Sequence, residues 1–242
     1  MHKKLLSLLC ALLLLICCIT GCVKKEDIHL GNVVIFGDSY STFTEYIPDG
    51  YSSWYSKTAS YTDVNSAKQT WWHQLIDRTY SQLLLNSSYS GSTICHTGYD
   101  GADVCEISFV GRMTKLFNQQ DFNKGQVNTV FVYGGLNDYW ANAPYGEIKY
   151  ENITPEDLYS IYPAFIYLLS NLKANLPNAR IIVIIEEYLG QEMKDNFALI
   201  CEHLAIEYIK PQNISKKNSH PDLLGMDELT NQIIDYLKTN SI

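Results

Sequence analysis

The stretch Val33-Val34-Ile35-Phe36-Gly37-Asp38-Ser39 decides the fold of this chain. Its first four residues are β-branched or aromatic, and a short apolar run of this kind is typical of a buried strand. Gly37, Asp38 and Ser39 favour a turn, so the strand is predicted to end there. Ligands of open α/β sheets bind beyond the carboxyl ends of the strands. Ser39 is therefore either the cap of the next helix or a reactive side chain at such a crevice.

Four more apolar runs resemble this strand, and segments with helical periodicity separate several of them. The five predicted strands are Asn32–Phe36, Leu83–Leu85, Thr129–Tyr133, Arg180–Ile185 and Ile206–Ile209. The predicted helices begin at a capping box, Ser66-Ala67-Lys68-Gln69, and at Thr154-Pro155-Glu156-Asp157, and two more span Gln191–Ala205 and Pro221–Lys238. This alternation predicts a mostly parallel sheet of about five strands with helices on both faces.

Three polar and aromatic stretches show neither a strand pattern nor a helix pattern. They are Tyr40–Asn65, Ser88–Asp121 and Ala141–Ile153. Each follows a predicted strand, so all three are expected as loops at the carboxyl edge of the sheet.

The first residues, 1–21, are predicted to be a signal peptide and not part of the fold. Lys3-Lys4 precede an apolar run, Leu5–Ile19, which is short for a membrane span. Ile19-Thr20-Gly21-Cys22 resembles a bacterial lipobox, which implies cleavage before Cys22 and attachment of lipid to its sulfur. The alternatives are a plain secretory signal or an anchor helix.

This interpretation divides the chain into three parts. Residues 1–21 are the lipoprotein signal peptide, residues 22–30 a lipidated tether, and residues 31–242 one α/β domain with a full core. The expected location is the bacterial cell envelope, with the lipid on Cys22 anchoring the protein to the outer membrane or the cell surface.

Charge and cysteine content exclude several classes of partner. Loss of residues 1–21 removes two lysines and moves the formal charge from −8 to −10. An acidic chain without a basic stripe is a poor candidate for nucleic-acid binding. No cysteine pair has close metal-ligand spacing with histidines, so neither a metal nor a cofactor is predicted. Cys95 and Cys105 flank a glycine-rich loop short enough for a disulfide, and Cys201 is the third cysteine beyond Cys22.

Four polar segments fall at predicted strand ends or before the last helix, where one crevice could collect them. They are Ser39, Ser90-Gly91-Ser92, Gly134-Gly135-Leu136-Asn137-Asp138 and His220-Pro221. Acyl transfer requires a nucleophile, a base and donors for the oxyanion. Ser39 supplies a hydroxyl, and His220, with Pro221 expected as the first helical residue, supplies a base. The backbone N–H groups of Ser39 and Gly91 and the Asn137 amide supply the donors.

These segments, in this order, resemble the sequence blocks of the GDSL/SGNH hydrolases. Gly37-Asp38-Ser39 matches the nucleophile block, Gly91 the glycine block, Gly135-x-Asn137-Asp138 the asparagine block and His220 the histidine block. The resemblance covers nearly the whole mature chain and implies a flavodoxin-like three-layer α/β/α sandwich that carries a serine esterase. No Gly-x-Ser-x-Gly surrounds Ser39, which argues against an α/β-hydrolase elbow. Asp38 and Asp138 are interpreted as turn-forming residues.

One position departs from the family pattern. The family usually carries Asp three residues before the histidine, and Lys217 stands there. A backbone carbonyl could orient His220 instead, or Glu186 or Glu187 could supply a carboxylate, or the protein could be a non-catalytic glycan binder. A Ser-His dyad is favoured, because the base and the oxyanion donors do not depend on an orienting acid.

Aromatic residues in the predicted loops indicate the class of substrate. Flat aromatic faces beside polar groups suit sugar rings, so Trp54, Tyr139 and Trp140 are expected to contact an acylated carbohydrate, with His96 as a further candidate. Tyr51, Tyr55 and Tyr145 share this setting. The predicted activity is removal of small acyl groups, such as acetyl, from carbohydrate. A lipase or thioesterase for longer acyl chains is the alternative enzyme.

Overall fold

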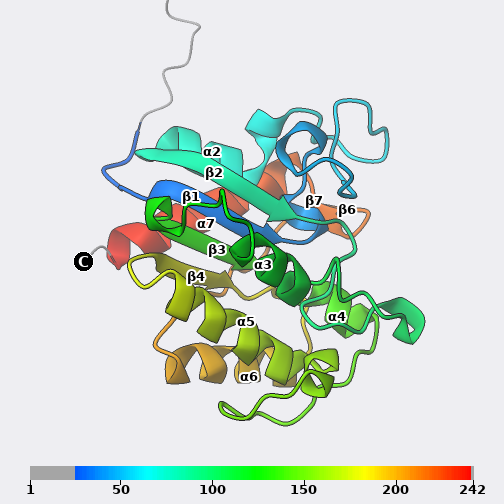
Figure 1. Cartoon of the computed structure of the whole chain (residues 1–242). Helices are drawn as coiled ribbons and strands as arrows, with labels where there is room; N and C mark the ends of the chain where they lie inside the picture. The colour runs from blue at the N-terminus through cyan, green and yellow to red at the C-terminus, as the bar shows by residue number, and fades with distance from the viewer. Residues whose placement is uncertain (1–24, 241–242) are drawn as a thin grey trace, which may run out of the picture.

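A five-stranded parallel sheet forms the centre of the structure, which is a computed structural model that describes residues 25–240. The strand order is β2-β1-β3-β4-β5 (Figure 1). The strands are β1 (Gly31–Gly37), β2 (Ser81–Ser88), β3 (Thr129–Tyr133), β4 (Arg180–Ile184) and β5 (Glu207–Ile209). The predicted signal peptide and Cys22 lie outside the described residues.

Helices cover both faces of this sheet, as Figure 1 shows. α2 (Trp71–Arg78) and α7 (Leu223–Thr239) lie on one face, and α3 (Phe109–Phe117), α5 (Ile161–Asn175) and α6 (Gln191–His203) lie on the other. The short helix α4 (Leu136–Trp140) and a two-stranded hairpin of β6 (Lys216–Lys217) and β7 (His220–Pro221) lie at the carboxyl edge. The predicted three-layer α/β/α sandwich is therefore confirmed. Within residues 25–240, no helix has both the length and the apolar character that crossing a bilayer requires.

Six short 3₁₀ helices complete the described secondary structure. They are Ser39–Ser41, Thr44–Tyr46, Ala67–Gln69, Tyr99–Gly101, Lys124–Gln126 and Glu156–Tyr159.

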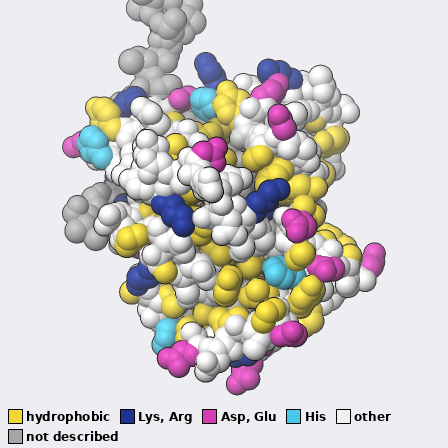
Figure 2. All heavy atoms as spheres, in the orientation of Figure 1, with side chains coloured by type: hydrophobic (Ala, Val, Ile, Leu, Met, Phe, Trp, Pro, Cys, Tyr) yellow, Lys and Arg dark blue, Asp and Glu magenta, His cyan; other side chains and the backbone are white. Residues whose placement is uncertain are grey.

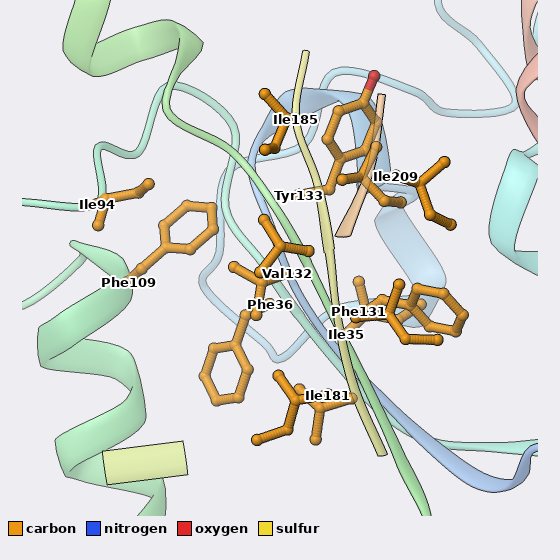
Figure 3. Close-up of a cluster of buried hydrophobic side chains, with 14 of the residues drawn as sticks. Ile35, Phe36, Ile94, Phe109, Phe131, Val132, Tyr133, Ile181, Ile185 and Ile209 are labelled. Carbon is orange, nitrogen blue, oxygen red and sulfur yellow. The ribbon is translucent and has the colours of Figure 1, made fainter. Parts of the chain in front are cut away.

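The core follows from the alternation of side chains along the strands. Phe36 and Val132 point toward α3 and its Phe109, whereas Phe131 and Tyr133 point to the opposite face (Figure 3). On that opposite face the ring of Trp71 packs 5.7 Å from the ring of Phe131 and 6.1 Å from that of Tyr133. Both faces of the strands are buried, which explains why the strand sequences are nearly continuous apolar runs.

The strand order creates one crevice at the carboxyl edge. β1 pairs with β2 on one side and with β3 on the other. The connection from β1 to β2 therefore runs toward one edge of the sheet, and the later strands β3, β4 and β5 are added toward the opposite edge. In doubly wound sheets this reversal opens the space in which ligands bind. The ends of β1 and β3 flank it, since Gly37 pairs with Tyr133. Ser39 and Asn137 follow these two ends directly.

Two predicted helix starts are wrong in detail. The capping box at Ser66 closes the 3₁₀ helix Ala67–Gln69, whereas α2 begins after Thr70, whose hydroxyl accepts from His73 N–H. Thr154 likewise precedes only a 3₁₀ helix, and α5 starts after Ser160. In both cases a short turn comes between the sequence signal and the helix that it was expected to start.

Helix α3 lies inside a stretch that was predicted to be a loop. Gly111 in its first turn obscured the helical pattern, because glycine disfavours helix interiors. A side chain there is impossible, since a Cβ on Gly111 would lie 1.7 Å from the carbonyl oxygen of Cys105. The glycine is therefore required by close packing and not by a break in the helix.

The start of the last helix also differs from the prediction. Pro221 belongs to β7, and Asp222 caps α7 by accepting from Gly225 N–H. His220 therefore lies on a strand directly after a hairpin turn and not at the start of a helix.

Candidate active site

Ser39 and His220 lie in contact although 181 residues separate them. His220 Nε2 is 2.9 Å from Ser39 Oγ. Ser39 begins a 3₁₀ turn whose cap is Asp38, which accepts from Tyr40 N–H. Both side chains are largely buried, with 5% of Ser39 and 8% of His220 exposed. The hydroxyl and the imidazole therefore meet in a site that admits little water.

The hairpin turn sets the tautomer of His220. Nδ1 lies 2.9 Å from the carbonyl oxygen of Asn218, and a carbonyl can only accept, so Nδ1 carries the proton of this bond. Nε2 is then the acceptor that faces the Ser39 hydroxyl. Asn218 and Ser219 have φ values of 51° and 62°, which are typical of the two-residue turn that joins tightly paired strands. The main-chain carbonyl of Asn218 thus accepts the hydrogen bond from Nδ1 that a carboxylate usually accepts in this family.

Neither glutamate considered as an orienting acid contacts His220. Glu186 accepts from the Tyr133 hydroxyl and forms an ion pair with Lys216. Glu187 accepts from the backbone N–H groups of Asn213 and Ile214. Both carboxylates are occupied by other partners, so the alternative in which Glu186 or Glu187 orients His220 is not realised in this structure.

Two of the predicted oxyanion donors, Gly91 and Asn137, lie on segments whose neighbouring residues are in contact. Gly91 lies in a tight turn with φ of 84°, and nothing stands within 4 Å of the place that a Cβ would take. Asn137 Nδ2 donates to Ser92 O at 3.1 Å and lies 3.5 Å from Asp38 Oδ2. Asn137 therefore connects the residue after Gly91 with the residue before Ser39.

Tyr99 is a site residue that the sequence did not indicate. Its hydroxyl donates to Asn137 Oδ1 at 2.8 Å, which fixes the amide so that Nδ2 stays on the side of Ser92 and Asp38. Its ring is 43% exposed and therefore borders the open part of the crevice. The only sequence signal was its place in a long aromatic loop, which does not single out one residue.

Two buried charged side chains hold the loops of the site. Asp138 accepts from the N–H groups of Ile94 and Cys95, and burial raises its pKa to about 6 although these hydrogen bonds oppose the rise. Arg112 donates to Gly37 O and to Ser92 Oγ, and burial lowers its pKa to about 10. Asp138 thus does more than form a turn, and Arg112 was not predicted at all.

Asp38 is a further buried ionisable group of the site. Burial raises its pKa to about 7, and the nearby carboxylates of Glu186 and Asp138 act in the same direction. The hydrogen bond from Tyr40 N–H opposes this rise, in agreement with the turn-forming role predicted for Asp38.

The residues predicted to contact substrate do not all lie at the crevice. Tyr139 and Trp140, on α4, are 37% and 41% exposed. Trp54 instead stacks on the His220 ring, with centroids 3.5 Å apart. His96 packs against Tyr159 and lines a separate hollow, between α3 and α5, that contains none of the residues around Ser39. Two more of the loop aromatics are also occupied, since Tyr55 is fully buried and Tyr145 stacks on Tyr162.

Metal-ligating side chains do not cluster in the described part of the chain. Across residues 25–240, no group of three or more His, Cys, Asp or Glu side chains comes together in a way that could hold a metal ion. Cys95, Cys105 and Cys201 are free thiols, so the disulfide considered between the first two is not formed here.

Comparisons with known proteins find similar sequences and similar structures. The family model of GDSL-like lipases/acylhydrolases matches residues 31–237. A structure described as a GDSL-like lipase from Bacteroides ovatus is 40% identical, with a TM-score of 0.82 over 87% of this chain and 99% of that one. A second, from Bacteroides uniformis, is 39% identical, with a TM-score of 0.79 over 86% of this chain and 96% of that one. A comparison with curated proteins finds no match.

A more distant structure has the same fold. A family two carbohydrate esterase from Clostridium thermocellum, solved with cellohexaose, is 14% identical, with a TM-score of 0.57 over 89% of this chain and 65% of that one. At this identity the likeness concerns the fold alone. The family model and the two Bacteroides structures, by contrast, cover most of the chain, and the chain therefore belongs to the GDSL-like lipase/acylhydrolase family of carboxylic ester hydrolases.

Proposed function

We propose that the protein is an envelope-anchored serine esterase that removes small acyl groups, such as acetyl, from carbohydrate. The contact of 2.9 Å between Ser39 Oγ and His220 Nε2 carries this proposal, together with the hydrogen bond that places the only imidazole proton on Nδ1. A serine hydroxyl that donates to a neutral imidazole is the arrangement that acyl transfer requires.

In the proposed mechanism, Ser39 Oγ attacks the ester carbonyl carbon while Nε2 of His220 takes the hydroxyl proton. The carbonyl oxygen becomes an oxyanion, which accepts hydrogen bonds from the N–H groups of Ser39 and Gly91 and from the Asn137 amide. The imidazolium then donates its Nε2 proton to the departing alcohol, which leaves an acyl-enzyme. Water, deprotonated by the same nitrogen, then attacks the acyl carbonyl carbon. The bond from this carbon to Ser39 Oγ breaks as the imidazolium returns its Nε2 proton to that oxygen, which releases the acid and restores the Ser39 hydroxyl and the neutral imidazole. Asn218 O accepts from Nδ1–H throughout.

The surroundings of the crevice favour a small acyl group on a polar alcohol. The Tyr99 hydroxyl donates to Asn137 Oδ1, so a polar side chain borders the proposed oxyanion donors. Figure 2 shows hydrophobic and acidic side chains together on the right-hand side of the view, and helix α4 lies on that side in Figure 1, inward of the loop that forms the edge. Exposed rings of Tyr139 and Trp140 on that helix suit stacking on a sugar ring. The distant fold relative solved with cellohexaose makes an acylated glycan a reasonable class to test.

The anchor is the second part of the proposal. The lipobox-like segment that ends at Cys22 would attach the protein to the envelope, and residues 22–30 would hold the domain close to its surface. Radiolabelled palmitate incorporation into the wild-type chain, but not into a Cys22→Ala variant, tests this part.

A series of aryl esters tests the substrate class. Aryl acetate is expected to be hydrolysed faster than aryl octanoate, and an acetylated oligosaccharide is expected to release acetate. Preference for octanoate would instead favour a lipase, as the descriptions of the two Bacteroides relatives suggest. Failure of a fluorophosphonate probe to label the wild-type protein would indicate a non-catalytic glycan binder.

The pH dependence of the esterase is expected to be unusual. Burial lowers the pKa of His220 from 6.5 to about 4, and nearby Lys216 acts in the same direction. Nε2 should therefore remain able to accept a proton in mildly acidic solution, so kcat/KM for aryl acetate should fall with a midpoint near pH 4. A midpoint between 6 and 7 that persists in Asp38→Asn would contradict this expectation. The Asp38 variant is the necessary control, since that carboxyl has a pKa of about 7.

The position of the missing acid offers a second prediction. Lys217→Asp restores the residue usual in the family, yet kcat is expected to change by less than about threefold, because exposed charges contribute little. The Lys217 side chain is exposed, and the Nδ1 proton of His220 is already bound by Asn218 O. Steady-state hydrolysis of aryl acetate measures the effect. An increase of tenfold or more would mean that the backbone carbonyl is an inadequate substitute for the carboxylate.

A further inference from the structure

Trp54 lies flat against the imidazole of His220. The two ring centroids are 3.5 Å apart and the planes differ by 5°, so the indole covers one whole face of the imidazole. Rings of Tyr40 and Tyr55 approach the same imidazole edge-on, at centroid distances of 5.2 and 6.5 Å. Three aromatic side chains therefore pack around His220, and all three belong to the segment that follows β1.

The backbone on either side of His220 is held by the same aromatic residues. The Tyr40 hydroxyl donates to Ser219 O at 2.5 Å, and the Tyr55 hydroxyl donates to Pro221 O at 2.7 Å. The residues before and after His220 are thus both fixed from the segment that carries Ser39. One segment, residues 39–61, therefore contributes the nucleophile and contacts both neighbours of the base.

Trp54, Tyr61, Asn218 and His220 contact one another in a closed ring around the hairpin turn. The Tyr61 hydroxyl donates to Trp54 O, and the Asn218 side chain donates to Tyr61 O. Asn218 O in turn accepts from His220 Nδ1, and the His220 ring stacks on Trp54. A displacement of the indole would therefore disturb both the plane of the imidazole and the carbonyl that orients it.

Two observations indicate that the Trp54 indole is not available to stack on a sugar ring. One face of its indole is taken by His220, and the Tyr61 ring also packs against it, at 4.7 Å. Its Nε1 is buried and donates to no other atom of the described residues. A buried N–H without a hydrogen-bond partner costs free energy, so a tryptophan at this position needs a compensating role. The stacking of the indole on the His220 ring is such a role.

The geometry points to Trp54 as a positioning residue that, with Tyr40 and Tyr55, holds the plane of the His220 ring while Asn218 O binds its Nδ1 proton. This inference rests on the proposed Ser-His mechanism. The indole confines the imidazole to the plane in which Nε2 faces Ser39 Oγ. It also presents the negative face of its π-system to the imidazolium that forms when Ser39 attacks, and cation–π attraction stabilises that ion away from water. Both effects act on the transition state and leave substrate binding unchanged.

Substitution of Trp54 by phenylalanine and by leucine tests the inference. Trp54→Leu fills part of the space without a π-system, and kcat for aryl acetate is expected to fall by about tenfold to a hundredfold with little change in KM. Trp54→Phe keeps an aromatic face and is expected to retain kcat within about threefold. Tyr80→Leu removes an exposed ring that precedes the amino end of β2, whereas the crevice lies at the carboxyl ends of the strands. It serves as the matched control with unchanged kcat.

A spectroscopic measurement makes the test independent of turnover. The Nδ1 proton of His220, bound to Asn218 O, should give a low-field proton NMR signal that is absent from His220→Gln. This signal should persist in Trp54→Phe and disappear in Trp54→Leu, because the mobile ring exchanges its proton with water.

Three results would overturn the inference. One is an unchanged kcat and NMR signal in Trp54→Leu. Another is a rise in KM confined to acetylated carbohydrate, which would make the indole a substrate contact. The third is equal loss in the phenylalanine and leucine variants, which would reduce its role to filling space. A wild-type protein that shows the low-field signal but hydrolyses no ester would refute the proposed function and leave the positioning of His220 intact.

Discussion

Ser39→Ala is expected to lower kcat for aryl acetate by at least about a thousandfold, because no other group can form the acyl-enzyme. The alanine removes one buried oxygen whose only described side-chain partner is His220 Nε2. The cap of this turn is the carboxylate of Asp38, which accepts from Tyr40 N–H and does not involve the Ser39 hydroxyl. The variant should therefore fold normally and fail only in chemistry.

Three measurements check this expectation. Steady-state hydrolysis of aryl acetate gives kcat, thermal unfolding reports the fold, and a fluorophosphonate probe should label the wild-type protein but not Ser39→Ala. Ser90→Ala, in the turn beside Gly91, is the matched control and should keep normal turnover. Substantial turnover by a well-folded Ser39→Ala would exclude Ser39 as the nucleophile.

His220→Ala is expected to produce the second largest loss, about a thousandfold or more in kcat, because the Ser39 hydroxyl then lacks a base. Removal of the imidazole leaves a slot that the flat face of Trp54 and the edges of Tyr40 and Tyr55 surround. Free imidazole fits the shape and polarity of that slot. Added imidazole should therefore restore part of the activity, and the rescue should saturate with its concentration.

The rescue experiment separates a base from a structural histidine. Aryl acetate hydrolysis is measured with increasing imidazole, and the background reaction of imidazole with the ester is subtracted by using the double variant with Ser39→Ala. His73→Ala, on α2, removes a half-buried histidine that pairs with Asp77, and should keep normal kcat. If His220→Ala retained more than about a tenth of wild-type kcat, a base role for His220 would be untenable.

The sheet and the order of the site segments were predictable because both depend on local sequence. Each strand is an apolar run long enough to recognise, and each run differs from the observed strand by only a few residues at its ends. Ser39, Gly91 and Asn137 follow such runs, so their common edge follows from the parallel topology. Helix α3 was missed because the glycine at position 111 reflects a backbone contact with Cys105, which no local pattern reveals.

The environment of His220 could not be predicted, because it depends on contacts between distant segments. The hydroxyl of Tyr40 reaches a carbonyl 179 residues away, and that of Tyr55 reaches one 166 residues away. The sequence indicated aromatic loops at the crevice but could not tell a ring that faces solvent from one that packs on the base. Lys217 was the one local signal, and it revealed only that the usual carboxylate is missing.

The hairpin between β6 and β7 changes how mutation can affect this site. When a side chain orients the histidine, a single base change in the gene can remove it. Here the acceptor is the main-chain oxygen of Asn218, which every amino acid carries. The orientation therefore tolerates substitutions that keep the turn, but it depends on the number of residues in that turn. Insertion or deletion of one residue would move the carbonyl away from Nδ1, so the vulnerability of the site lies in the length of the chain at this point.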